Sequence, residues 1–166
     1  MRKKQGQIVF EQLINVLVEH NYSYWFRIDE ENKSLQDIIF FHPWSVKCLN
    51  SFPQVLVMDT TYNTNSYEDK ETFMWALECL KMVMKRLPNV IVTDRDLALV
   101  YAVEHVFSTS AHFLCQRHIQ MDIETYVTKM MSNNIMGKSV VKRWKTLIAS
   151  RTEEDFWSGW EGLQEH

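Results

Sequence analysis

Two short stretches decide the fold, VLVMD at residues 55–59 and VIVTD at residues 90–94. Each is a mostly apolar run that ends in an aspartate, which is typical of a strand buried on both faces in a parallel sheet. Between them, residues 69–87 repeat apolar side chains at helical spacing, and residues 96–107 predict a second helix. With a third strand predicted at 111–115, the strand–helix alternation calls for a parallel sheet with right-handed crossovers.

The flanking segments predict a helix, a hairpin and a helical tail. Residues 7–20 have helical spacing, and residues 22–29 and 35–41 predict two strands joined by a polar turn. A short helix is expected to follow from Pro43 to about Asn50, because proline is favoured in the first helical turn. The tail from Arg117 to His166 is predicted to be helical, with one break near residues 133–134 and Gly137 and another near residues 150–151.

Composition excludes several classes of protein. The 166 residues are 46% apolar with only 4 Gly and 3 Pro, which excludes a disordered or collagen-like chain. No apolar run approaches the length of a transmembrane helix. The net charge of −3 argues against a strongly basic nucleic-acid binder, so any such contact must come from a local patch. The cysteines, an odd and widely spaced set, are expected to be free thiols: Cys48, Cys79 and Cys115.

Asp59 and Asp94 are the first candidate site. Neighbouring parallel strands would place both carboxylates at the carboxyl edge of the sheet, where ligand sites of open α/β sheets lie. Two adjacent carboxylates repel each other unless a cation lies between them, and their hard oxygen ligands suit Mg²⁺ or Mn²⁺. A two-metal site for phosphoryl transfer normally uses a third acid. The alternative interpretation is that both residues only cap strand ends or the helices that follow.

Cys115 and His118 form a C-x-x-H pair. The pair supplies two zinc-type ligands where a structural site wants four, and although His105 and His112 lie nearby, no second paired motif follows. A Cys–His nucleophilic dyad would need an orienting acid. The plainer interpretation is a partly buried cysteine at a strand end, with His118 in the first turn of the next helix.

A basic stretch runs from Lys138 to Arg151. Lys138, Lys142 and Lys145 fall on one helical face and could contact DNA phosphates. A solvated helix face is the favoured alternative, and the acidic residues at 153–155 would partly cancel the field.

Three motifs together resemble the Mutator-like element (MULE) transposases, in particular the far-red-impaired-response type. They are FPQVLVMDTTYNTNSY at 52–67, VIVTDRDLAL at 90–99 and HFLCQRH at 112–118. The resemblance covers about residues 7–130. It implies a nuclear, DNA-directed protein with an RNase H-like core that uses an acidic triad and Mg²⁺ or Mn²⁺ to cut and join DNA. By motif match, Asp59 and Asp94 correspond to the first two acids, and Cys115 and His118 to a signature near the active site.

The chain also departs from the family pattern. No residue matches the third acid, and the short connection after Asp59 cannot hold the two strands that the family places there. We therefore expect a shortened, C-terminally truncated relative whose RNase H-like core lacks two strands. Its segments would be an N-terminal helix and hairpin at 1–52, a partial transposase core at 53–131 and the start of a helical insertion at 132–166.

Three functions follow from these expectations. The first is a DDE-type transposase domain, inactive as this chain because the third acid and two strands are missing. The second is a non-catalytic, domesticated regulator that binds DNA or protein, and the third is an unrelated hydrolase using Cys115 and His118. The first acidic strand, left with an open edge, is expected to be covered by the 22–41 hairpin or by a second molecule through self-association. No membrane partner is expected.

Overall fold

The computed structural model describes residues 2–60, 70–131 and 135–164. Within these residues the chain is a mixed α/β protein that divides into two compact units, Met1–Phe113 and Leu114–His166. The connection predicted from Thr60 to Tyr67 lies almost entirely outside the described residues, as does the predicted break at 133–134. None of the described helices is both long and apolar enough to cross a membrane.

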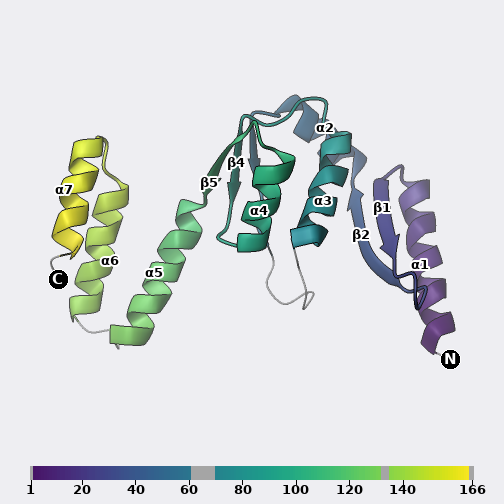
Figure 1. The fold of residues 1–166 in the computed structure, drawn as a ribbon, viewed down its shortest axis with the longest axis horizontal. Coiled ribbons are helices and arrows are strands. Elements are labelled where there is room, and N and C mark those ends of the chain that lie inside the picture. The colour runs from purple at the N-terminus through teal and green to yellow at the C-terminus, as the bar shows by residue number, and fades with distance from the viewer. Residues whose placement is uncertain (1, 61–69, 132–134, 165–166) are drawn as a thin grey trace. The chain divides into compact units, whose positions relative to one another are not determined.

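The first unit begins with a helix packed on a hairpin (Figure 1). Helix α1 (Arg2–Glu19) ends where Asn21 adopts a left-handed conformation with φ of 57°, and strands β1 (Ser23–Ile28) and β2 (Leu35–Phe41) then pair antiparallel, as predicted. The rings of Phe10 and Phe26 meet edge to face with centroids 5.2 Å apart, which joins α1 to the hairpin.

Arg27 connects this hairpin to the rest of the unit. Its guanidinium forms an ion pair with Asp37 at 2.7 Å, donates to the Thr72 hydroxyl at 2.9 Å and lies 4.7 Å from the ring centroid of Trp75. One side chain on β1 therefore contacts its partner strand β2 and helix α3 (Lys70–Val83).

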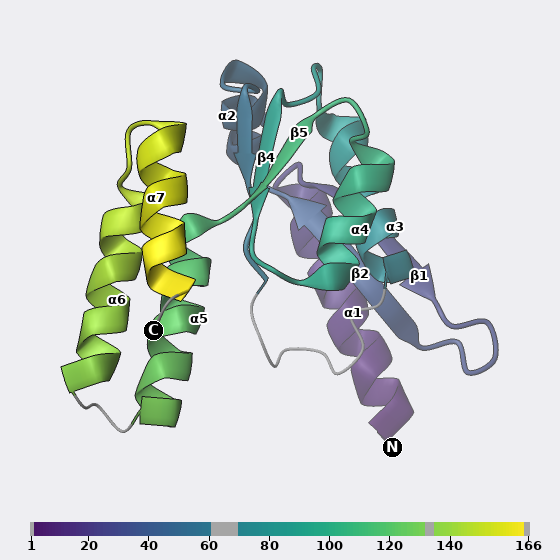
Figure 2. The same cartoon turned by 60° about the vertical axis from the view of Figure 1, so that its left-hand side comes forward.

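The second sheet has the predicted strand order. Strand β3 (Val55–Val57) pairs in parallel with β4 (Val90–Thr93), and β5 (Ala111–Leu114) lies on the other side of β4 (Figure 2). The backbone amide of Ala111 donates to the carbonyl of Asn89, so β4 and β5 start side by side and also run parallel. Helices α3 and α4 (Leu97–Val106) form the crossovers.

The core lies between this sheet and its crossover helices. Ile91 is 0% exposed at its centre, and the surrounding apolar side chains come from β3, β4, α3 and α4. The prediction that β3 is buried on both faces is wrong, because Val55 is 53% and Val57 67% exposed. Within the described part of the chain, helices cover only the face that carries Leu56.

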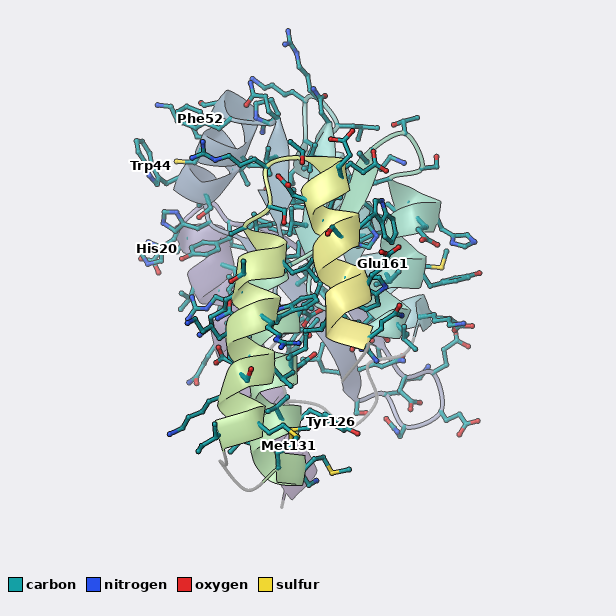
Figure 3. All side chains as sticks on the ribbon, turned by 90° about the vertical axis from the view of Figure 1, so that its left-hand side faces the viewer. His20, Trp44, Phe52, Tyr126, Met131 and Glu161 are labelled. Carbon is teal, nitrogen blue, oxygen red and sulfur yellow. The ribbon has the colours of Figure 1, made fainter. Side chains whose placement is uncertain are left out.

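Of the two expected covers for the edge of β3, the hairpin is wrong, and a second molecule stays a prediction. The hairpin β1–β2 forms a sheet of its own, and β3 is the end strand of the other. Helix α2 (Pro43–Ser51) separates the two sheets in sequence, with no buried residue, and Trp44 and Phe52 are exposed there (Figure 3). The hairpin contacts helix α3 through Arg27 instead.

The described residues of the second unit form helices α5 (Gln116–Met131), α6 (Ile135–Ile148) and α7 (Glu153–Gln164). The predicted break near residues 150–151 is confirmed. The predicted break at Gly137 is wrong, because this glycine is buried inside α6, where a Cβ atom would lie 3.0 Å from Cγ1 of Val127. Gly137 allows α5 and α6 to approach each other closely, and it does not end a helix.

Candidate functional site

The carboxyl ends of β3 and β4 bring together the segments that carry Asp59 and Asp94. Val57 pairs with Val92, and the amide of Met58 donates to the Val92 carbonyl at 2.9 Å. Continuing that register by two residues places Asp59 opposite Asp94. The strands end here because the chain turns from apolar to polar residues on both of them.

The Asp94 carboxylate is buried and occupied by hydrogen bonds. It is 4% exposed, its Oδ2 accepts from both the backbone amide and the hydroxyl of Thr60, and its Oδ1 accepts from the Asp96 amide at 3.3 Å. Asp59 lies on the surface. The two acids therefore differ in environment, one fixed in the interior and the other accessible.

A third aspartate, Asp96, caps helix α4. The side chain of Asp96 accepts from the amides of Ala98 and Leu99 at 2.8 and 3.0 Å, which makes it the N-cap of α4. Asp94 instead holds Thr60, the residue directly after Asp59, against the end of β4. The alternative interpretation of Asp94 as a strand-end cap is thus compatible with its contacts.

Sequence reasoning gave no role to Thr93 and considered His112 only beside the C-x-x-H pair. Thr93 is 0% exposed, and its hydroxyl donates to the Asp94 carbonyl at 2.7 Å and lies 2.9 Å from Nε2 of His112. The side chain of His112, on β5, thereby reaches the end of β4. The available signal was the position of His112 on the third strand of the sheet.

Cys115 and His118 lie where the plainer interpretation places them. Cys115 is a half-buried free thiol between β5 and α5, its carbonyl accepts from the Ile119 amide at 3.1 Å, and His118 lies in the first turn of α5. Cys48 and Cys79 are also free thiols. The described residues contain no group of three or more His, Cys, Asp or Glu side chains arranged to hold a metal ion.

Lys138, Lys142 and Lys145 line one groove between α5 and α6. The groove has a volume of about 410 Å³, and Gly137 and Val127 form part of its wall. Lys145 Nζ lies 2.8 Å from Oε1 of Glu124, which also lines the groove. The predicted common face of the three lysines is confirmed, and it faces a carboxylate of the neighbouring helix.

Comparison with known families finds a similarity over part of the chain. Residues 66–122 match the model of the MULE transposase domain, which confirms the resemblance drawn from the sequence. Asp94, Cys115 and His118 fall within this match, and Asp59 precedes it.

A curated relative extends the similarity over more of the chain. The chain is 25% identical over 137 residues to Protein FAR-RED IMPAIRED RESPONSE 1 of Arabidopsis thaliana, covering 76% of this chain. It spans only 16% of that protein's length. No solved structure matches the chain significantly.

Proposed function

We propose that this chain is a transposase-derived, DNA-directed domain of the DDE type that does not cleave or join DNA by itself. The parallel order β3–β4–β5 of the described strands, with two crossover helices, supports an RNase H-like origin. The two further strands of the full core are expected to be missing on sequence length alone, because the connection after Asp59 is too short for them. The observation that carries the proposal is the meeting of the Asp59 and Asp94 segments at the carboxyl edge of β3 and β4. A nuclear location follows from the family resemblance alone.

The donor set fits one weakly held divalent ion and does not fit a two-metal centre. Two carboxylates are suitable ligands for Mg²⁺ or Mn²⁺. An ion held in this way takes its other ligands from water and substrate phosphates. A two-metal centre needs a further acid, and the described residues supply none in a cluster. The ion would also compete with Thr60 and Asp96 for the Asp94 oxygens. Bound there, it would neutralise phosphate charge.

The groove between α5 and α6 is the proposed contact for DNA. Its three lysines, Lys138, Lys142 and Lys145, face the same opening and outnumber the single carboxylate that lines it. Lysine side chains bind phosphates as point charges, without reading sequence. We therefore expect weak, non-specific binding that falls steeply with salt.

A non-catalytic regulator that binds DNA or protein is the second candidate. It is favoured by the burial of Asp94 and by the hydrogen bonds that already occupy both of its carboxylate oxygens. The two candidates differ in whether Asp59 and Asp94 hold a metal.

Metal binding separates the candidates. We expect Mn²⁺ titration, followed by electron paramagnetic resonance, to show one weak site that is lost in Asp59→Asn. This variant is suitable because Asp59 is exposed, and Asp122→Asn, an exposed aspartate on α5, is the matched control that keeps the site. Equal binding by wild type and Asp59→Asn would favour the regulator.

A nicking assay tests the absence of catalysis. Supercoiled plasmid incubated with the wild-type chain and Mn²⁺ should remain supercoiled. Robust nicking that disappears in Asp59→Asn would contradict the proposal, since it would require a third acidic ligand from elsewhere in the chain or from a second subunit.

A further inference from the structure

The charges of the α5–α6 groove are not equivalent. Lys145 forms an ion pair with Glu124, whereas Lys138 and Lys142 form no ion pair with any residue that the structure describes. Oε1 of Glu124 also accepts a hydrogen bond from Nε2 of Gln120 at 3.0 Å. The carboxylate is thus held in the groove from two sides, by the preceding turn of its own helix and by the facing one.

The three lysines form a row along α6. At about 1.5 Å of rise per residue, the seven steps from Lys138 to Lys145 span roughly 10.5 Å. Successive phosphates of one DNA strand advance about 3.4 Å along the duplex axis, so the row covers on the order of three steps. A row of this length suits a chain of phosphates better than one isolated anion.

Glu124 lies beside Lys145, the last lysine of this row. Its hydrogen bonds with Lys145 and Gln120 lower the pKa of the Glu124 carboxyl, so the group is ionised at neutral pH. The Lys145 and Glu124 side chains are 51% and 38% exposed. An ion pair this open to water is weak and can be displaced by another anion.

We propose that Glu124 is a built-in competitor for DNA, with its carboxylate in the place of a phosphate on Lys145. The inference rests on the proposed role of the groove and adds its regulation. In the free protein two of the three lysines are available, and full engagement of the row requires the Glu124–Lys145 pair to open. The chain thus limits its own affinity for a polyanion.

The test compares charge-removing variants of the full chain. Binding of a fluorescein-labelled duplex of arbitrary sequence is measured by anisotropy at several salt concentrations. Glu124→Gln should bind about two- to five-fold more tightly than wild type, the range that an exposed ion pair supports. The slope of log affinity against log salt should steepen by up to about one, because one more lysine reaches a phosphate.

Glu161→Gln is the matched control. Glu161 is an exposed residue on α7 (Figure 3), outside the groove, and its replacement changes the net charge by the same amount. Equal affinities of Glu124→Gln and Glu161→Gln would overturn the inference, since the gain would then come from net charge alone. Circular dichroism checks that both variants keep the fold.

Two lysine variants distinguish this inference from the proposed DNA-binding function on which it rests. Lys142→Ala should weaken binding, and Lys129→Ala, an exposed lysine on α5 outside the groove, should leave it nearly unchanged. If Lys142→Ala weakens binding but Glu124→Gln has no effect, the groove binds DNA and the competitor role is wrong. If no variant binds at low salt, both the DNA site and its regulation are wrong. Single-stranded RNA and inorganic phosphate as competitors show which source of phosphate the groove accepts.

Discussion

At the scale of single residues, the buried carboxylate of Asp94 joins the ends of two strands through its hydrogen bonds. A charged group taken out of water has to recover its hydrogen bonds from the protein, and Asp94 recovers them from the Thr60 amide, the Thr60 hydroxyl and the Asp96 amide. These bonds fix the start of the connection after β3 to the end of β4. The position of Asp59 therefore depends on the neighbouring threonine.

Removal of the Thr60 hydroxyl should destabilise the first unit. Thr60→Val keeps the shape of the side chain but leaves the Asp94 carboxylate with one hydrogen bond fewer, and hydrogen bonds to charged groups contribute about 1.5–3 kcal/mol. We expect a loss of stability of that order in urea unfolding. Thr60→Ser, which retains the hydroxyl, should lose much less. Equal losses for the two variants would mean that the hydroxyl bond is unimportant.

At the level of elements, two glycines of one helix differ in what lies beside them. In α7, a Cβ atom on Gly159 would lie 2.9 Å from Cδ1 of Leu147 on α6, whereas one on Gly162 would meet nothing within 4 Å. The same residue type thus has a packing role at one position and none at the next turn.

This contrast predicts opposite effects of alanine within one helix. Gly162→Ala should stabilise the chain by about 0.5 kcal/mol, since alanine is the better helix former and space is open. Gly159→Ala should destabilise it by about 1–3 kcal/mol, because Leu147 is buried and its Cδ1 has little room to move away from the new Cβ atom. Thermal unfolding followed at 222 nm measures both, and a stabilising Gly159→Ala would show that Leu147 moves away easily.

The elements also show what the sequence could predict. Periodicity located the hairpin, the sheet order and most helices, because these follow from local spacing and turn residues. It could not reveal that Val55 and Val57 are exposed, since an apolar run looks the same whether one or both faces of a strand are covered. Likewise, the position of Gly137 inside α6 depends on Val127 of another helix, which local sequence does not encode.

At the scale of the molecule, the charge is divided unevenly. Leu114–His166 contains equal numbers of basic and acidic residues, so the net charge of −3 resides in Met1–Phe113. The acidic candidate site lies in the acidic unit, and the lysine row lies in the neutral one. The motifs could place Asp59 and Asp94 but not Glu124 opposite Lys145, because that pairing arises only when α5 and α6 pack.

Strand β3 has an edge that is suited to self-association. It is the end strand of its sheet, and its valines are exposed. Light scattering of the wild-type chain should show mass rising with concentration, and Val57→Lys should suppress the rise. Val18→Lys replaces a valine that is 58% exposed on α1 and should not suppress it. A wild-type chain that stays monomeric at high concentration would contradict this.

The hydroxyl of Thr93 has a consequence for the tautomer of His112. The hydroxyl owns a single proton, which it gives to the Asp94 carbonyl, so the hydrogen bond with His112 has to use a proton on Nε2. The neutral imidazole is thereby restricted to the tautomer with its proton on Nε2, and Nδ1 is left as the hydrogen-bond acceptor of the ring. A bound molecule would therefore meet an acceptor at Nδ1, and nitrogen-15 spectra of the neutral ring should show the proton on Nε2.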